Sequence, residues 1–234
     1  MGYTKRSDGR KMDEMRKIEV KVGVVPNADG SALFAFGDTI AIASVFGPRP
    51  LYPQHSQDPS KGIIRCNYTM LPFSVTERAR PGPNRRSQEI GKITEWALTP
   101  CVDLKDYPGT VVDVHVVILQ ANASTRCAGI NAAAIAMAHA GVPMKEMVSA
   151  ISIGKIDDKI VTDITKEEED HKEGEGATDI PMAFLSKSGR ISLLQLDGMI
   201  QTRRLKEAIE AGRKACKEIY KIQEDVLKKS LKEK

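Results

Sequence analysis

"TVVDVHVVILQANASTRCAGINAAAIAMAHAG", residues 110–141, decides which fold the chain can adopt. The run TVVDVHVVIL is rich in valine and isoleucine, which is typical of a long, mostly buried strand. The alanine-rich run after it predicts a helix, which Gly141 and Pro143 would end. A long strand followed by such a helix indicates a fold in which helices pack on sheets.

Shorter strand-like runs precede this stretch and are separated by turn residues. Apolar residues recur at helical spacing from about Arg85 to Leu98, and Asn84 is a suitable N-cap for that helix. The strands expected in this part are residues 17–25, 31–36, 39–47 and 63–71.

The rest of the chain repeats the pattern of strands followed by a helix. The expected strands are residues 150–156, 159–164, 180–185 and 191–196, and a long helix is expected from about Thr202. We therefore predict an α+β fold of two similar strand-then-helix halves, residues 1–146 and 147–234, that together form one globular domain with mixed sheets and packed helices.

The composition excludes several classes of protein. No run approaches the ~18 apolar residues that a membrane-spanning helix needs, so no membrane contact is expected. The four cysteines form no C-x-x-C pair and the four histidines form no H-E-x-x-H motif. These features predict reduced thiols in a cytoplasmic protein and argue against a zinc enzyme. The net charge of +4 is too small to indicate nucleic-acid binding, so the distribution of charge matters.

Positive charge gathers in "RARPGPNRRSQEI", residues 78–90, just before and at the start of the helix expected from about Arg85. A cation there opposes the helix dipole unless an anion neutralises it. The segment is therefore either a solvated basic loop or a phosphate site, and its position favours phosphate. The arginines concerned are Arg78, Arg80, Arg85 and Arg86.

A second helix start has the same character in "QANASTRCAG", residues 120–129. Ser124 and Thr125 are good N-caps, and their hydroxyls can donate to a phosphate oxygen. An ordinary cap explains either of these two residues but not Arg126 in the first turn. Two strand-to-helix junctions with arginines could therefore converge on one phosphate.

The third feature is an acidic stretch, "TKEEEDHKEGEGATDIP", residues 165–181. Most of its carboxylates are expected to form a solvated loop. Asp179 differs because it adjoins an apolar strand, so a rigid edge could hold it as a Mg²⁺ ligand or a general acid. The carboxylates are Glu167, Glu168, Glu169, Asp170, Glu173, Glu175 and Asp179.

Together these stretches resemble the RNase PH family, and within it the catalytic ring subunits of archaeal exosomes. The resemblance spans nearly the whole chain and includes "RSDGRKMDEMRKIEV", "ADGSALFAFGDT", "RCNYTMLPFS", "RPGPNRRSQEI", "STRCAG" and "TDIPMAFL". It implies an RNase PH-like fold and phosphorolysis of single-stranded RNA from its 3′ end. In that reaction inorganic phosphate attacks the terminal phosphodiester and a nucleoside 5′-diphosphate leaves.

The resemblance also implies the roles of individual residues. It assigns phosphate binding to Arg86, Ser124, Thr125 and Arg126, and it makes Asp179 the acid or a Mg²⁺ ligand. RNA contacts are expected from the remaining arginines, Arg65, Arg78, Arg80 and Arg85. For Arg65, a surface ion pair with a nearby carboxylate is the alternative.

Two positions depart from the family pattern. The family usually has glycine at Ser124, so serine must adopt any backbone conformation that glycine favours there. The family also has an aspartate six residues before the essential one, where this chain has Glu173. The matching pair here is Glu169-Asp170, so Asp170 is the tentative second metal ligand.

The implied assembly is a hexamer of three heterodimers, in which this chain alternates with a related non-catalytic subunit and binds RNA-binding cap proteins. One alternative is a structural ring subunit that binds RNA without activity. Another is a metal-dependent nuclease that uses water, which would need convergent carboxylates and no phosphate site.

Overall fold

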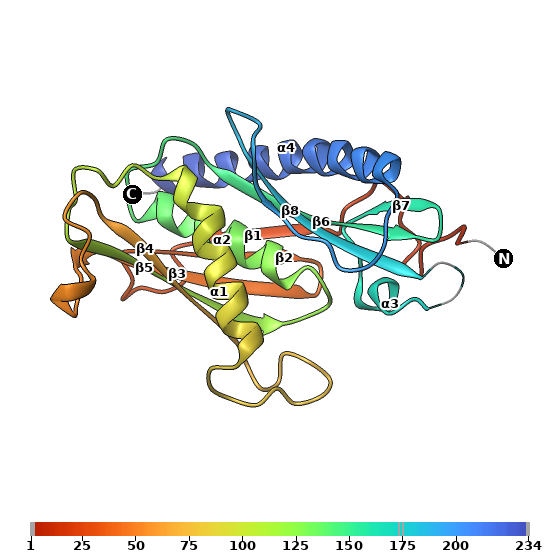
Figure 1. The fold of residues 1–234 in the computed structure, drawn as a ribbon, viewed down its shortest axis with the longest axis horizontal. Helices are drawn as coiled ribbons and strands as arrows, with labels where there is room; N and C mark the ends of the chain where they lie inside the picture. The colour runs from red at the N-terminus through yellow and green to blue at the C-terminus, as the bar shows by residue number, and fades with distance from the viewer. Residues whose placement is uncertain (1–2, 173, 175, 233–234) are drawn as a thin grey trace.

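Two β-sheets and the helices packed on them form the computed structural model, which describes residues 3–172, 174 and 176–232 (Figure 1). The elements of the first half are β1 (Ile18–Val22), β2 (Gly30–Phe36), β3 (Thr39–Pro50), β4 (Ile63–Met70), α1 (Arg85–Leu98), β5 (Thr110–Gln120) and α2 (Thr125–His139), with 3-10 turns at Gln54–Ser56 and Thr99–Cys101. Those of the second half are β6 (Val148–Ile156), β7 (Lys159–Thr162), α3 (Lys166–Glu169), β8 (Ala177–Leu185), β9 (Ile191–Leu194) and α4 (Thr202–Lys232). The predicted α+β class is confirmed.

The first sheet has the strand order β1-β2-β3-β5-β4 and the second has the order β7-β6-β8-β9. All neighbouring strands are antiparallel except β4 and β5. Because α1 connects these two parallel strands, the first half is not a plain run of strands followed by helices. The helix at residues 85–98 thus forms part of a crossover, which the sequence pattern did not distinguish.

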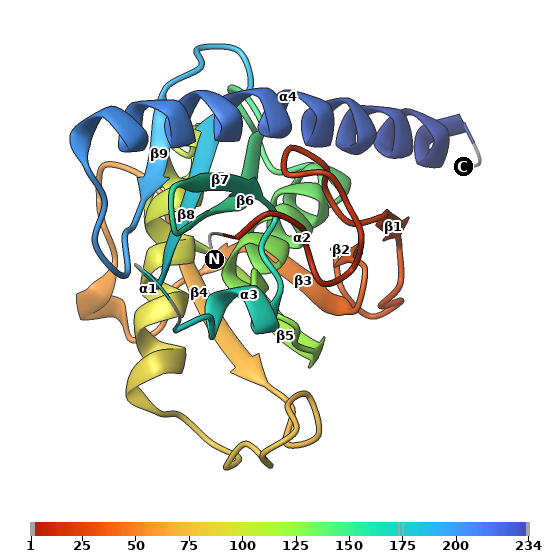
Figure 2. The same ribbon diagram turned by 90° about the vertical axis from the view of Figure 1, so that its right-hand side faces the viewer.

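The alanine-rich helix α2 lies between the two sheets and contacts strands of both (Figure 2). Every residue from Cys127 to Met137 is buried. Small side chains allow a helix to approach a sheet on each side, which explains the alanine content of this segment. The beginning of α2 is thereby fixed at the junction of the sheets.

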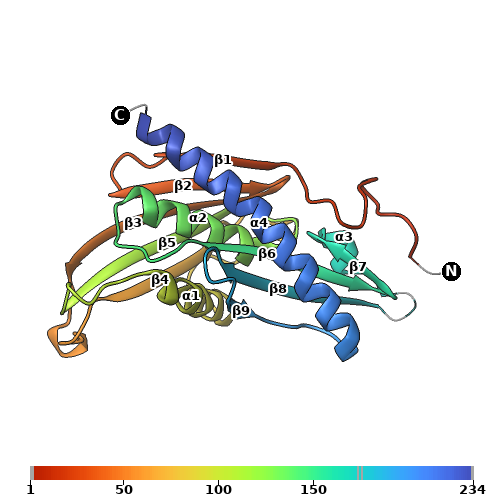
Figure 3. The same ribbon diagram turned by 90° about the horizontal axis from the view of Figure 1, so that it is seen from above.

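The C-terminal helix α4 covers the second sheet and extends to β1 of the first (Figure 3). A buried polar network fixes its position. Nε2 of Gln223 donates to Oδ1 of Asn131 at 3.2 Å and to the carbonyl of Val148 at 3.3 Å, and Ser149 Oγ donates to Gln223 Oε1 at 2.9 Å. The network connects α2, β6 and α4 through side chains that all lie in the core.

No helix within the described part of the chain is long and apolar enough to cross a membrane.

Candidate functional site

A cavity of about 720 Å³ opens where the helices α1 and α2 begin and where strands of both sheets meet. Most of the residues singled out in the sequence lie around it. Its lining includes Arg80, Arg86, Ser124, Thr125, Arg126, Asp170 and Asp179, together with Tyr68, Ser152, Lys166 and Glu169. Arg65, Arg78 and Arg85 are not part of this lining.

Arg86 occupies the first turn of α1 as a cation with no counter-ion. The helix begins with a capping box, in which the Ser87 N–H donates to Asn84 Oδ1 at 2.8 Å and the Asn84 N–H donates to Ser87 Oγ at 2.9 Å. Arg86 is exposed and forms no ion pair with any described carboxylate. A cation at a helix N-terminus costs about 0.3–1 kcal/mol, and a bound anion would reverse that sign.

The start of α2 differs from the expected capping. Ser124 has a left-handed backbone, with φ 54°, and its side chain does not cap the helix. Its Oγ instead donates to Asp163 Oδ1 at 3.3 Å. The prediction of a side-chain cap at Ser124 is therefore wrong, because the hydroxyl points to the loop between β7 and α3. The first-turn N–H groups of α2 consequently have no side-chain cap and can bind an anion.

The left-handed conformation is the one that glycine adopts easily, and serine adopts it here at a cost of about 1–2 kcal/mol. A buried ion pair offsets that cost. Nη2 of Arg16 lies 2.6 Å from Asp163 Oδ1, and Nε donates to Oδ2 at 2.8 Å. Arg16 also donates to the carbonyl of Asn122 at 2.6 Å. Arg16 and Asp163 thus fix residues 122–124, the segment just before α2. Sequence analysis missed both residues because 147 positions separate them.

Asp179 lies within β8 and not ahead of it, and its carboxylate contributes to the cavity wall. Burial raises the pKa of Asp179, and the nearby Glu169 and Asp197 raise it further. A hydrogen bond from Ser152 and the charge of Arg126 lower it, but the net pKa lies above the ordinary value. A carboxyl group with a raised pKa is suited to donating a proton.

Arg126, in the first turn of α2, lines the cavity and donates a hydrogen bond to Oε1 of Gln195, just beyond β9. No described carboxylate forms an ion pair with Arg126. Its charge is therefore available to a ligand. Gln195 was not recognised in the sequence, where it lies at the end of an expected strand and nothing marks it as part of a site.

The acidic stretch is more structured than expected. Thr165 and Glu168 form the capping box of α3, and Glu168 is buried. Nε and Nη2 of the buried Arg6 donate to its two carboxylate oxygens at 2.8 and 2.9 Å. The expectation of a solvated loop is thus wrong for Glu168. The spacing of Thr165 and Glu168 is the capping-box signal that could have predicted the helix.

Asp170 lines the cavity but forms an exposed ion pair with Lys166, whose Nζ lies 2.8 Å away. The other position considered for a second acid, Glu173, lies outside the described residues. No group of three or more metal-ligating side chains occurs within the described ranges. Carboxylates that could provide oxygen ligands to a metal ion line the cavity at Asp179 and Asp170, with Glu169 beside them.

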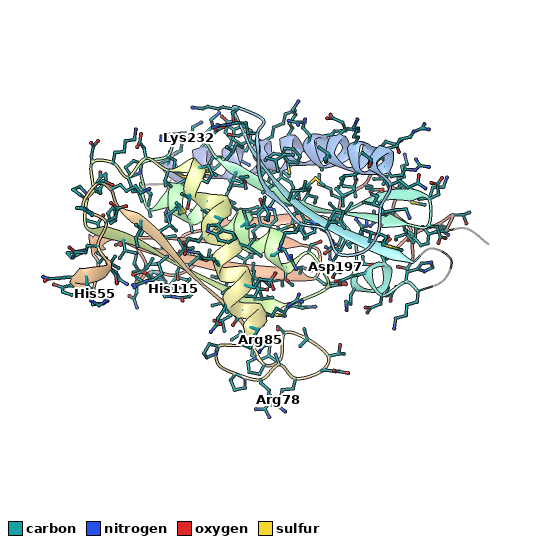
Figure 4. All side chains as sticks on the ribbon, in the orientation of Figure 1. His55, Arg78, Arg85, His115, Asp197 and Lys232 are labelled. Carbon is teal, nitrogen blue, oxygen red and sulfur yellow. The ribbon has the colours of Figure 1, made fainter. Side chains whose placement is uncertain are left out.

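The remaining arginines lie outside the cavity. Figure 4 shows Arg85 at the start of α1 and Arg78 in the loop beside it, and both side chains are exposed. Arg65 lies on the far face of the first sheet, where Nε donates to Asp113 Oδ1 at 2.6 Å. Arg49 donates to the same carboxylate from β3. The ion pair named as the alternative for Arg65 is thus present. Contact between Arg65 and RNA stays a prediction.

Comparison with known proteins identifies the family. The 3′ exoribonuclease family, RNase PH, matches with its domain 1 over residues 14–143 and with its domain 2 over residues 146–215. The exosome complex component Rrp41 of Methanopyrus kandleri is 45% identical over 95% of this chain and 92% of its own length. Rrp41 of Pyrococcus furiosus is 46% identical over 96% of this chain and 88% of its own.

Two solved structures share the fold. Rice Rrp46 has a TM-score of 0.84 at 24% identity and covers 95% of this chain and 100% of its own. A chain of the Archaeoglobus fulgidus exosome with RNA bound to the active site has a TM-score of 0.77 at 22% identity, with 93% and 92% covered. The predicted RNase PH-like fold is confirmed. The chain belongs to the 3′ exoribonuclease family of RNase PH-like proteins.

Proposed function

We propose that the protein is a phosphorolytic 3′–5′ exoribonuclease and the catalytic subunit of an exosome ring. It would degrade single-stranded RNA with inorganic phosphate and release nucleoside 5′-diphosphates. One observation carries the proposal: Asp179 of β8 shares a cavity with Arg86 of α1 and with Thr125 and Arg126 of α2. Relatives named as exosome components support the same assignment.

The reaction brings two anions together, the phosphate nucleophile and the terminal phosphodiester of RNA. Arg86, Arg126 and the first turn of α2 would hold the nucleophile and reduce its repulsion from the RNA phosphate. An oxygen of inorganic phosphate forms a bond to the RNA phosphorus, and the bond from that phosphorus to the 3′-oxygen breaks. Asp179, whose pKa is raised, would give its proton to the departing oxygen.

Mg²⁺ is the metal that the family implies, and the donors present are compatible with it. In the alternative role of Asp179, as an ionised metal ligand in place of the acid, Asp179 and Asp170 would hold the ion through carboxylate oxygens, the ligand type that Mg²⁺ prefers. Sites with one or two carboxylates commonly complete their coordination with water and substrate phosphates. When bound, the ion would neutralise charge on the reacting phosphates.

A structural ring subunit without activity is the second candidate. It would have no need of an acid with a raised pKa beside two arginines that lack counter-ions. The cavity has all three features, which favours the enzyme. A nuclease that uses water is less well supported, because the described residues offer few convergent carboxylates and two anion-binding helix starts.

We also propose the ring assembly, a hexamer of three heterodimers with an inactive RNase PH-like partner and RNA-binding cap proteins, acting in the cytoplasm. Exposed apolar side chains on α1 and around the edge strand β9 support a protein partner. Trp96 is 62% exposed and Met199 is 87% exposed, with Ile191, Leu194 and Leu196 also exposed. Since α1 contacts β9, these residues lie on neighbouring elements that a ring partner could cover.

A product assay tests the proposal. The chain is incubated with 3′-unstructured RNA and Mg²⁺, with and without phosphate and with and without the partner subunit, and its mass in solution is measured. We expect diphosphates that form only with phosphate, and strong activity only in the ring. Monophosphates without phosphate would indicate the nuclease that uses water, whereas RNA binding with no products in the ring would indicate the structural subunit. A fully active monomer would contradict the proposed ring assembly but not the proposed phosphorolysis.

A further inference from the structure

Tyr68 lines the cavity, although the sequence analysis gave it no role. It is on β4 opposite Val116 of β5, and only 4% of its surface is exposed. A glycine of each of the helices α1 and α2 lies beside it. A methyl group at Gly129 of α2 would lie 3.8 Å from its ring atom Cε2, and one at Gly91 of α1 would lie 3.6 Å from its backbone nitrogen. The tyrosine is thus enclosed by the two helices whose first turns line the cavity.

The phenolic hydroxyl of Tyr68 is buried and has no hydrogen-bond partner among the described residues. A buried hydroxyl without a partner is unfavourable, and such groups in native structures often belong to ligand sites. Burial raises the pKa of Tyr68, while the Thr125 hydroxyl, which lies close enough to interact with the phenol, and the charges of Arg86 and Arg126 lower it. The net increase keeps the hydroxyl protonated at neutral pH, so it can donate to an anion.

The cavity lining shows which groups surround Tyr68. Thr125, Arg86 and Arg126 are the residues of the two helix starts that line the cavity, and all three lie near enough to influence Tyr68. An anion held between the two arginines would bring an acceptor oxygen to a donor that otherwise has none. The site is therefore built from a buried side chain as well as from helix ends.

We propose that Tyr68 is a phosphate-binding residue whose hydroxyl donates a hydrogen bond to an oxygen of the inorganic phosphate held by Arg86, Thr125 and Arg126. The identity of this anion as the nucleophile rests on the proposed phosphorolysis. Binding of phosphate itself does not, so the two ideas can fail separately.

The test compares Tyr68→Phe with the matched control Tyr107→Phe, which alters a tyrosine on a surface loop away from the cavity. Phosphate is titrated calorimetrically into the full-length protein, in the assembly that it forms, without RNA. We expect the Kd for phosphate to rise about ten- to hundredfold in Y68F, as for loss of a hydrogen bond to a charged group. In Y107F it should not change.

Thermal unfolding without phosphate separates this role from a structural one. Removing a hydroxyl that has no partner should leave Tm unchanged or raise it, whereas added phosphate should stabilise Y68F less than the unaltered protein. A lower Tm without phosphate together with an unchanged Kd would show a structural bond, for instance to Thr125, and would overturn the proposal.

Activity then distinguishes the two proposals. A higher KM for phosphate in Y68F, at saturating RNA and with diphosphate products, supports both. Weaker phosphate binding in Y68F from a protein that forms no diphosphates supports the role of Tyr68 and contradicts phosphorolysis. Diphosphate formation with the same KM and Kd in Y68F overturns the role of Tyr68 alone. Absence of phosphate binding in the unaltered protein overturns both.

Discussion

Ser152 donates a hydrogen bond to Oδ1 of Asp179 from the neighbouring strand of the second sheet. Ser152 is almost fully buried, so the bond is shielded from competing water. It stabilises the ionised carboxylate and limits the rise in the pKa of Asp179 that burial and Glu169 produce. The serine therefore sets the protonation state of the residue to which we assign proton transfer.

Ser152→Ala should shift the pH dependence of activity to higher pH, because the pKa of Asp179 rises when the hydrogen bond is lost. Whether the rate falls or rises with pH in the range that shifts identifies the role of Asp179. A protonated acid gives a rate that falls as pH increases through this pKa, whereas a metal ligand gives a rate that rises. Rates with saturating RNA and phosphate, measured across pH for both proteins, check this. An identical profile in S152A would show that Asp179 does not control the rate.

Asp179→Asn should reduce product formation by about 10²–10⁴-fold, as expected for loss of a positioned acid, and should leave RNA affinity nearly unchanged. Asp179→Ala should have the same effect on activity. Single-turnover rates and RNA-binding curves for each variant provide the measurement. Degradation at a comparable rate would show that the assignment of Asp179 is wrong.

The same Asp179→Asn variant should be more stable than the unaltered protein at neutral pH. A pKa that is higher in the folded state means that the folded state holds the proton more tightly, so ionisation of Asp179 destabilises the fold as pH rises. Asparagine avoids this penalty and keeps an acceptor for Ser152. Thermal unfolding should show a gain at pH 7 that shrinks as pH falls towards the ordinary pKa of an aspartate. A lower Tm at pH 7 for Asp179→Asn than for the unaltered protein would contradict this prediction.

Arg86→Ala and Arg126→Ala should each raise the KM for phosphate more than they weaken RNA binding. Because both guanidinium groups would act on one anion, the double variant should lose less than the sum of the two single effects on a free-energy scale. Arg85→Ala is the matched control, since Arg85 precedes Arg86 but does not line the cavity. An unchanged KM in both single variants, or additive effects, would refute a shared anion site.

Arg65→Gln should weaken binding of long single-stranded RNA and reduce the salt dependence of binding by about 0.7 in slope, if one phosphate contact is lost. The control is Arg49→Gln, which also removes a guanidinium from Asp113. Equal changes in RNA affinity and in its salt dependence in both variants would show that the effect arises through Asp113. Normal binding in Arg65→Gln would mean that the ion pair is the main role of Arg65.

Local sequence pattern was enough to place the strands and the three long helices, though not α3, because their apolar spacing and end residues are local. Asn84 capped the helix as expected, and the two arginine-bearing helix starts did meet in one cavity. Long-range pairs could not be anticipated. Neither Arg16 with Asp163 nor Arg6 with Glu168 has a spacing that marks it as a pair, and burial of both partners depends on the completed fold.

Tyr68 shows the same limit within the cavity. On β4 it has the strand position of any core tyrosine, and only the packing of α1 and α2 reveals that its hydroxyl lacks a partner. Ser124 shows the reverse case. The family pattern pointed to a backbone that glycine favours, and the structure has serine in that conformation.

The unit that folds is longer at both ends than the range that the two family domains match. The family matches run from residue 14 to residue 215, yet Arg6 and Gln223 lie beyond those limits and are buried. A fragment trimmed to the matched range would leave the carboxylate of Glu168 buried without its guanidinium, which costs about 3–5 kcal/mol. That is a large share of the ~5–15 kcal/mol that keeps a domain folded. Truncation for expression or crystallisation should therefore keep both flanks, since they close the core from outside the two matched family domains.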